Sequence, residues 1–591
     1  MSGHRSIDPF AILRILGRLL LLAVVAVLAM LMARSEEMPV RLRASSGDEP
    51  LRRDVTVVAD AVGERVRIGR LDLLLSDFRF VLEDGSEVRS TTRAAFVGLG
   101  GAPESFFLRD RPRGPIRSVR FRVGLTPELD RVDVATLASD DPLNPSVNRL
   151  HWGWLGGYVF LALEGNGRTA SGVEEGFSFH LAGPAAAMPV ELPYVAGPGG
   201  DGAQDWILDV ARVLGAVPGA RLGASTHSRA DDPLVRDLIR AVPGAFRIAK
   251  GPAVGESVAS TVRPASSEVD VASTATPYRF PVPVGFPIPT LPRDNPLTVE
   301  GVELGRRLFH EPLLSLGGRQ SCASCHSAQD AFVDAGRRFS RGAEGKEGAR
   351  NTMPLANLAW QGPYFWDGRA TSLREQVLMP IANPVEMHES PGEAVRKLEE
   401  AGYGPAFGKA FGTGVVTVDR LARALEQFLL AQVSADSKFD RVGRGEAEFT
   451  ALERRGFELF FTEHDPRRER YGADCFHCHG GPLFTDSAFH SNGLDAEGAW
   501  PDDGRGKVTA NGADRGRFRT PSLRNVARTA PYMHDGRFAT LDEAVAHYCT
   551  GVKRAANLDP NLAKHPDGGV GLDTADQQAL VAFLRTLSDL R

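Results

Sequence analysis

Two short stretches, CASCH at residues 322–326 and CFHCH at residues 475–479, decide the architecture of this 591-residue chain. Each reads C-x-x-C-H, the attachment pattern of c-type haem. At this spacing two thiols can form thioethers with the vinyl groups of one porphyrin, and the histidine that follows supplies an iron ligand. The sequence therefore predicts two covalently bound haem c groups. Their attachment and ligand residues are Cys322, Cys325 and His326, and Cys475, Cys478 and His479.

Two other kinds of site share parts of this pattern. A redox dithiol also has cysteines at this spacing, but it has no need of a histidine directly after them. A structural zinc site requires closely spaced pairs of ligands. The repetition of the complete pattern favours haem over both alternatives. Of the five cysteines only Cys549 lies outside the two motifs, so no disulfide framework can form within the chain, and the role of Cys549 stays open.

The first 33 residues have the pattern of an export signal. Arg5, Arg14 and Arg18 precede the apolar run Leu19–Ala33, as a charged n-region precedes an h-region. This run is short for a membrane-spanning helix, although Phe10–Ala33 is compatible with an uncleaved anchor. We expect residues 1–33 to be a signal peptide or an inner-membrane anchor. The body of the protein is then expected in the periplasm, because bacterial c-type haem is attached outside the cytoplasmic membrane.

The overall composition narrows the class of protein further. The chain is 42% hydrophobic and 24% charged, which is ordinary for a globular protein. A net charge of −5 over this length gives no basic surface that would indicate a nucleic-acid partner. The chain is also too long for a single hydrophobic core, so it is expected to be multidomain.

The region from residue 54 to residue 248 has the periodicity of β-strands. Short runs such as Val119–Val123 and Tyr158–Glu164 alternate apolar and polar residues and end at Gly, Asp or Pro. This pattern predicts an N-terminal, mainly-β domain with a β-sandwich fold. The charged residues 34–53 before it are interpreted as a tether. Leu234–Phe246 is predicted to form a helix near the end of the domain.

The remaining chain is predicted to be helical. Residues 249–280 are rich in Ser, Ala, Val, Pro and Thr and are interpreted as an interdomain linker. Residues 281–440 and 441–591 are predicted to be the first and second cytochrome c-type haem domains, with one motif each. Helical spacing of apolar residues and capping boxes predict helices at Pro391–Ala401, Val418–Leu430 and Ala451–Phe461, and helices that begin at Thr540 and Thr574.

The whole of Pro281–Arg591 resembles the bacterial dihaem cytochrome c peroxidase/MauG family. The family's landmarks follow one another in its order: LF at 308–309, RNT at 350–352, FWDGRA at 365–370, NPVEM at 383–387, TPSLRNV at 520–526 and APYMHDG at 530–536. The resemblance implies two haem groups with different tasks. One is a peroxidatic haem that meets hydrogen peroxide, and the other is an electron-storing haem.

The resemblance also implies roles for particular residues. His326 would bind the iron of the peroxidatic haem, and His479 would bind the iron of the electron-storing haem. Glu386 matches the distal acid/base, and heterolysis of H₂O₂ does need a group that takes a proton from one oxygen and returns it to the other. Gln376 matches a distal-pocket glutamine, and Trp366 matches the tryptophan between the haems. By residue type alone, the alternatives are a surface glutamate, an exposed helical glutamine and a core tryptophan.

Two further matches concern metal ligands. Asn351, together with the backbone near Thr520, matches an interhaem calcium site, although no cluster of acidic residues marks that ion. Tyr548 falls where the electron-donating peroxidases of the family place an axial methionine, and where the MauG-like branch has a tyrosine. Its spacing from Leu541, Ala544 and Val545 also fits a tyrosine on the apolar face of a helix.

Two departures from the peroxidase pattern point to the MauG-like branch. A phenolate from Tyr548 is a harder ligand than a thioether and favours high-valent iron over Fe(II). In addition, no histidine lies between His326 and Arg350, so the distal histidine of resting peroxidases is missing. The first haem is therefore expected to be open to peroxide without prior reduction. Both features favour an enzyme that stores two oxidising equivalents and oxidises a protein side chain.

The β region resembles a second family, the MbnP-like copper-binding proteins. The matching stretches are HWGWLGGY at 151–158, FSFHL at 177–181 and THS at 226–228. The resemblance implies a copper site, with His180 and His227 as candidate ligands, since imidazole suits copper. It also implies that a dihaem enzyme of the MauG/MbnH type converts one tryptophan to kynurenine, with Trp152 and Trp154 as candidates. The alternative is that these side chains are ordinary core or backbone-bonded residues.

Three functions remain open from the sequence. The first is a periplasmic, H₂O₂-dependent dihaem oxidase that modifies a tryptophan of its own N-terminal domain, or of a second copy, to build a copper site. The second is a bacterial dihaem cytochrome c peroxidase that reduces H₂O₂ with electrons from a small cytochrome or a cupredoxin. The third is a non-enzymatic copper-binding or electron-transfer protein. The Tyr548 and distal-histidine departures favour the first.

Overall fold

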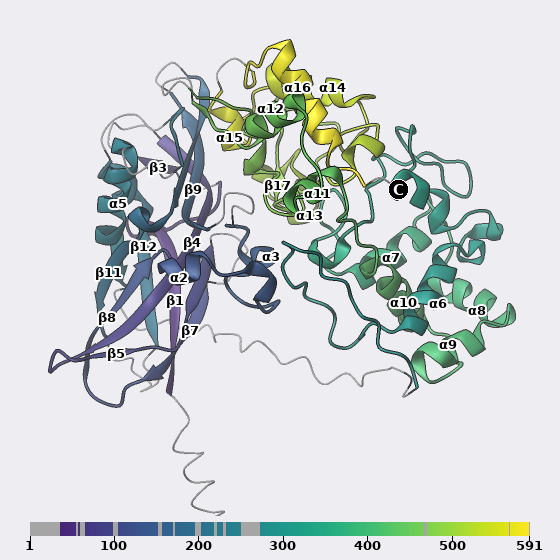
Figure 1. Cartoon of the computed structure of the whole chain (residues 1–591), viewed down its shortest axis with the longest axis horizontal. Coiled ribbons are helices and arrows are strands. Elements are labelled where there is room, and N and C mark those ends of the chain that lie inside the picture. Colours follow the sequence, from purple (N-terminus) through teal and green to yellow (C-terminus); the bar gives the residue numbers. More distant parts are fainter. Residues whose placement is uncertain are drawn as a thin grey trace, which may run out of the picture.

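The computed structural model has a β-rich N-terminal half and a helical C-terminal half (Figure 1). The structure describes residues 36–54, 57–59, 65–98, 104–151, 157–169, 172–195, 203–217, 222–227, 232–249, 272, 274–465, 470–565 and 568–589. The predicted signal or anchor at 1–33, both candidate tryptophans (Trp152 and Trp154) and most of the predicted linker lie outside these residues. Within them, no helix is long and apolar enough to cross a membrane.

The β half is a sandwich of two sheets, as predicted. One sheet has the order β14-β12-β1-β2, with β7 also paired to β1; the other has the order β11-β8-β4-β9-β10-β13, with β3, β5 and β6 also paired to β4. The strands are β1 (Glu36–Ser46), β2 (Glu49–Pro50), β3 (Val57–Ala59), β4 (Arg65–Leu82), β5 (Glu87–Arg89), β6 (Ala94–Gly98), β7 (Ser105–Arg111), β8 (Ile116–Val123), β9 (Val159–Arg168), β10 (Glu174–Ala182), β11 (Met188–Pro193), β12 (Gln204–Asp209), β13 (Ser225–His227) and β14 (Phe246–Ile248).

The tether expected at residues 34–53 is wrong, because β1 lies inside a sheet. It pairs in parallel with β12 and antiparallel with β7. Met38, Val40 and Leu42 are buried, whereas Arg41 between them stays partly exposed. This alternation is the period of a strand with one buried face. The high charge of the segment hid that period in the sequence.

Aromatic side chains fill the space between the two sheets. The ring of Trp206 on β12 stacks on Phe121 of β8, with centroids 4.7 Å apart. Phe246 meets Phe121 edge-on at 5.4 Å. The predicted helix near the end of the domain is confirmed as α5 (Pro233–Ala245), whose N-cap Asp232 accepts a hydrogen bond from the backbone N–H of Leu234. The shorter helices are α2 (Pro127–Asp130), α3 (Pro145–Asn148) and α4 (Val210–Gly215).

The C-terminal half is helical around each C-x-x-C-H motif, which agrees with the predicted fold class. Around the first motif lie α6 (Val299–Phe309), α7 (Leu373–Ala382), α8 (Pro391–Glu400), α9 (Gly404–Phe411) and α10 (Val418–Leu430). Around the second lie α11 (Lys438–Gly443), α12 (Ala451–Phe460), α13 (Gly506–Thr509), α14 (Leu541–Ala546), α15 (Pro560–Ala563) and α16 (Thr574–Arg585). Short two-residue strands, β15 (His464–Asp465), β16 (Arg470–Tyr471), β17 (Phe489–His490) and β18 (Phe518–Arg519), pair within this half.

The predicted helices are confirmed, and the capping residue of one of them is corrected. The predicted capping box of Thr540 with Glu543 is present at the start of α14. The last helix, α16, is capped by Asp573 rather than by Thr574. Its carboxylate accepts a hydrogen bond from the backbone N–H of Asp576, and an aspartate caps a helix at least as well as a threonine.

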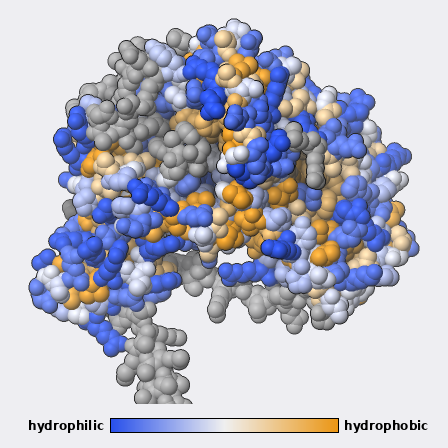
Figure 2. Space-filling view, in the orientation of Figure 1, coloured by the Kyte–Doolittle hydropathy of each residue, from blue (hydrophilic) through white to orange (hydrophobic). Residues whose placement is uncertain are grey.

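The β domain docks on the helical half through polar contacts. Arg517 pairs with Asp54 at 2.7 Å, and Arg554 donates to the carbonyl of Glu174 at 3.0 Å. At the other end, the side chain of Asn144 next to α3 donates to the carbonyl of Ile288. Hydrophobic side chains gather around this junction in Figure 2, while much of the periphery is hydrophilic. The two halves are thus joined by specific contacts across the junction.

The backbones of the two halves approach each other closely at a glycine. A Cβ added to Gly176 on β10 would lie 2.3 Å from the carbonyl oxygen of Pro560 on α15. We expect Gly176→Ala to loosen the docking at an overpacking cost of about 1–3 kcal/mol. Hydrogen–deuterium exchange of β10 and α15 should therefore rise. The matched control is Gly215→Ala, whose added Cβ meets no atom within 4 Å, and unchanged exchange in Gly176→Ala would contradict this view of the junction.

Candidate active site

The first motif opens onto a cavity of about 1030 Å³ in the first haem domain. Cys322, Cys325 and His326 line one part of it, and Gln376 and Glu386 line another. Neither thiol is in a disulfide bond, so both are available for thioethers. The structure therefore brings the predicted haem ligand and the two predicted distal residues into one cavity.

The second motif opens onto a cavity of about 230 Å³ in the second haem domain. Cys475, Cys478 and His479 line it together with Tyr548. Met533, from the APYMHDG stretch, also lines this cavity. The predicted proximal and axial ligands of the second haem thus share one space.

Both proximal histidines are oriented in the same way. Nδ1 of His326 lies 2.8 Å from the carbonyl oxygen of Phe332, and Nδ1 of His479 lies 3.0 Å from that of Phe484. An Nδ1–H donated to a carbonyl leaves Nε2 as the free lone pair for a metal. Burial lowers the pKa of both imidazoles, which favours the neutral form that binds iron. The donor sets therefore fit two c-type haem groups.

Glu386 lies in the loop that follows α7. Its carboxylate accepts a hydrogen bond from Nδ2 of Asn383 at 2.6 Å. Burial raises the pKa of Glu386, while the Asn383 bond and the positive charge of Arg369 partly offset that rise. A carboxyl with a raised pKa can take up a proton and return it, as a distal acid/base must.

Gln376 on α7 also fits a cavity that holds a ligand. Its Oε1 atom is buried and has no hydrogen-bond partner in the described part of the chain. A buried amide oxygen without a partner is destabilising. A bound group or a water in this cavity would satisfy it, which agrees with the distal-pocket role implied for this residue.

The raised pKa of Glu386 leads to a pH prediction. Only its carboxylate form accepts a proton from H₂O₂, and burial keeps the carboxyl protonated to a higher pH than in free glutamate. We expect the second-order rate constant for peroxide to rise as the pH increases through this raised pKa and to fall below it. Stopped-flow measurements across the acid range would show this limb. The limb should disappear in Glu386→Gln, and a limb that persists there would assign the titration to another group.

Trp366 lies between the two cavities. It lines both of them, is 8% exposed, and donates its indole N–H to the carbonyl of Asn351 at 2.8 Å.

The two residues expected to bind calcium, Asn351 and Thr520, both line the second cavity. Neither of them has a carboxylate. The calcium site they were expected to form stays a prediction.

Tyr548 lies in a π-helical turn, His547–Gly551, that follows α14. Its hydroxyl accepts a hydrogen bond from Nδ2 of Asn492 at 3.2 Å. Burial raises the pKa of Tyr548 to about 12, so the phenol keeps its proton at neutral pH in the absence of a bound cation. If Tyr548 binds haem iron, the ferric ion would supply the positive charge that ionises this buried phenol.

The predicted copper ligands lie on neighbouring strands. His180 of β10 pairs with His227 of β13 in the parallel ladder. The His180 side chain is 6% exposed, and its Nε2 lies 2.7 Å from the carboxylate of Glu164. Among the described residues, the groups of three or more side chains that could share a metal ion all lie in the helical half. Copper at His180 and His227 therefore stays a prediction.

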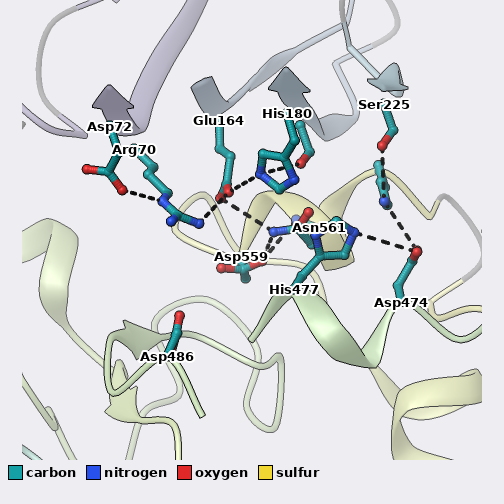
Figure 3. A network of polar contacts seen from close by, with 12 residues as sticks. Arg70, Asp72, Glu164, His180, Ser225, Asp474, His477, Asp486, Asp559 and Asn561 are labelled. Atoms are coloured by element: carbon teal, nitrogen blue, oxygen red, sulfur yellow. Dashed lines mark hydrogen bonds and ion pairs between the residues drawn. The ribbon is translucent and has the colours of Figure 1, made fainter. Parts of the chain in front are cut away.

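Sequence reasoning missed a buried charge network at the junction of the two halves (Figure 3). On the helical side, Lys564 contacts both Glu463 and Asp474, and His477 lies 3.0 Å from Glu463. Ser225 of β13 donates to Glu463 at 2.5 Å. The sequence offers one signal for this network, which is His477. This histidine occupies a position of the C-x-x-C-H motif at which any residue is allowed.

Figure 3 shows how the two sides of this network meet. Glu164 and His180 reach down from the β-strands, and His477 and Asn561 reach up from the helical half. Nδ2 of Asn561 donates to Glu164 at 3.4 Å. Burial by itself would raise the pKa of Glu164, but Arg70 and His180 outweigh it and hold that pKa below its ordinary value. An ionised carboxylate therefore lies in the centre of the interface.

Comparisons with known proteins agree with both halves. Residues 299–448 match the family model of di-haem cytochrome c peroxidase, and residues 35–219 match that of MbnP. The chain is 36% identical to the methylamine utilization protein MauG of Methylorubrum extorquens, over 56% of this chain and 89% of that protein. It is 37% identical to the cytochrome c551 peroxidase of Nitrosomonas europaea, over 51% of this chain and 84% of that protein.

A solved structure is also similar. It is the crystal structure of a MauG-like protein associated with microbial copper homeostasis, with 34% identity and a TM-score of 0.48. The match covers 53% of this chain and 96% of that one.

Proposed function

Because the chain belongs to the di-haem cytochrome c peroxidase family and carries an MbnP domain, we propose that it is a dihaem oxidase that uses H₂O₂ to oxidise a tryptophan of its own β domain. Trp152 and Trp154 are the candidate targets. The oxidised side chain would then contribute to a copper site, with His180 and His227 as candidate ligands. We place this enzyme in the periplasm, where c-type haem is attached.

One observation supports this proposal above all. The β domain is docked on the second haem domain, with His180 of β10 facing His477 of the CFHCH motif at a ring separation of 5.2 Å. His151, the residue before Trp152, lines a cavity of about 400 Å³ at this junction together with Phe476 and His477. An oxidising centre and its protein substrate need such proximity.

The haem groups, when bound, supply the redox chemistry. The chain's own residues prepare and direct it. Glu386 takes up a proton and returns it in the first cavity, Asn383 orients its carboxylate at 2.6 Å, and Trp366 lies between the two cavities. Tyr548 lines the second cavity and would supply a ligand that favours oxidised iron. Calcium near Asn351 and Thr520 would hold the two haem domains together at this point.

The test is the mass of the peptide that spans residues 151–158. After peroxide treatment of the holoprotein, we expect that peptide to carry added oxygen or the mass of kynurenine. The chain with Glu386→Gln should leave it unmodified. If the wild-type peptide stays unmodified with both haems loaded, and a reduced small cytochrome or cupredoxin supports steady turnover of peroxide, then the chain is a conventional cytochrome c peroxidase.

A mixing experiment separates modification within a chain from modification between chains. One chain carries Glu386→Gln and intact tryptophans, and the other carries Trp152→Phe and Trp154→Phe with an intact haem half. We expect the mixture to leave the first chain unmodified after peroxide, because its β domain is already docked on its own inactive half. Modification of that chain would show that a second copy is the substrate.

A further inference from the structure

Two imidazoles from different domains meet at the centre of the junction. His180 projects from β10 and is 4% exposed, and the side chain of His477 is 1% exposed. Their ring centroids lie 5.2 Å apart. Figure 3 shows the two rings between the strands and the second haem motif. This ring pair joins the β domain directly to the haem-binding loop.

Both rings are fixed by carboxylates of their own domain. Nε2 of His180 lies 2.7 Å from Glu164, which Arg70 also contacts at 3.0 Å. Nε2 of His477 lies 3.0 Å from Glu463. A ring that is hydrogen-bonded and buried keeps one orientation, so the contact between the rings persists. Such a contact is suited to electron transfer, which depends on a short and constant separation.

His477 has a special place in the chain. It lies between Cys475 and Cys478 in the second motif, so one peptide bond joins it to a residue that bonds the second haem. Its ring also stacks on Phe476, with centroids 4.4 Å apart. The backbone and the ring of His477 therefore extend from the haem attachment site to the surface that faces the β domain.

From His180 the path continues through the sheet. His180 pairs with Ala162 of β9, and just before the start of that strand lies Tyr158, which forms a bridge with His151. The rings of Tyr158 and His151 are 4.7 Å apart. His151 is the first residue of the HWGW stretch that holds the candidate tryptophans. The described residues thus connect the second haem motif with the beginning of that stretch.

We propose that His477 and His180 form the electron-transfer contact between the second haem and the β domain of the same chain. This inference rests on the proposed function and names its route. Reduction of one H₂O₂ to two water molecules takes up two electrons and two protons. The electrons leave an indole ring of the β domain one at a time and cross the imidazole pair. The indole and the water that attacks it release the two protons, and the imidazoles end unchanged.

The experiment compares three variants of the holoprotein: His180→Gln, His477→Gln and His565→Gln. The last is a matched control, because His565 belongs to the same buried network through Asp474 at 2.8 Å but is not part of the imidazole pair. Glutamine keeps a hydrogen-bond donor at each site. One equivalent of H₂O₂ is added, and the decay of the oxidised haem absorption is followed by stopped flow. The yield of modified 151–158 peptide is measured on the same samples.

We expect the oxidised haem absorption to decay about tenfold more slowly in His180→Gln and in His477→Gln than in the wild type. This factor corresponds to ~1.4 kcal/mol on the free-energy barrier of the electron transfer. The double variant should be no slower than either single variant, since both break one contact. His565→Gln should match the wild type. Haem reduction potentials and hydrogen–deuterium exchange at the junction are measured in every variant, so that altered haems or undocking are recognised.

The proposed electron-transfer contact would be overturned if both His180→Gln and His477→Gln showed the wild-type decay rate of the oxidised haem absorption and the wild-type yield of modified peptide. Slow decay that is accompanied by undocking in these two variants would also overturn it, because the contact would then be only structural. An unmodified peptide in the wild type would instead reject the proposed function. In that case the decay rates still report whether electrons from the β domain pass through the imidazole pair.

Discussion

Glu386→Gln is expected to lower the second-order rate constant for H₂O₂ by about 10²- to 10⁴-fold, the usual contribution of a positioned acid/base. Glutamine keeps the shape and the hydrogen bond to Asn383 but cannot take up a proton. The two haem attachments lie on other segments of the chain, so haem content and the resting absorption spectrum should stay the same. Stopped-flow mixing of the ferric protein with peroxide measures the effect.

A matched control for this substitution is Glu347→Gln. Glu347 is an exposed glutamate paired with Arg341 on the surface, so its variant should react with peroxide like the wild type. A rate constant near the wild-type value in Glu386→Gln would reject the acid/base role. It would then direct attention to Gln376, the other predicted distal residue in the cavity.

Tyr548→Met is expected to change the type of reaction. A methionine at this position raises the reduction potential of a haem relative to a phenolate, and axial ligands span about 0.8 V in proteins. We expect a rise on the order of a few hundred millivolts within that range for the second haem. The variant should then lose modification of the 151–158 peptide and gain peroxide turnover with an added small reductant.

The control for this substitution is Tyr532→Phe. Tyr532 lines the same cavity, and its hydroxyl donates to the carbonyl of Val526 at 3.0 Å. Spectroelectrochemical titration of both variants separates ligand exchange from a general disturbance of the cavity. An unchanged potential in Tyr548→Met would mean that Tyr548 does not bind the iron.

The parts of the molecule that the sequence predicted depend on local patterns. The C-x-x-C-H motifs, the capping box of Thr540 and the helix at Val418–Leu430 are each set by residues a few positions apart. Glu386 and its partner Asn383 are likewise three residues apart. Short-range geometry of this kind is encoded in the order of residues and needs no knowledge of the whole fold.

The junction between the halves could not be predicted in this way. Ser225 and Glu463 are 238 residues apart, and Arg67 and Ala556 are 489 residues apart. Each of these residues has ordinary neighbours in the sequence, so nothing local marks it as part of an interface. The strand at Glu36–Ser46 was missed for a related reason, because its partner β12 lies more than one hundred residues away.

The close packing of Gly176 against Pro560 has a consequence for stoichiometry. A catalyst that is joined to its substrate and packed against it meets that substrate at an effective concentration of about millimolar or higher. The rate of oxidation should then be independent of dilution. Each chain also holds a single substrate domain, so the enzyme completes its maturation once. Once that domain is oxidised, no docked electron donor remains for further peroxide. A titration of protein with peroxide should therefore show a sharp break in the amount of peroxide consumed.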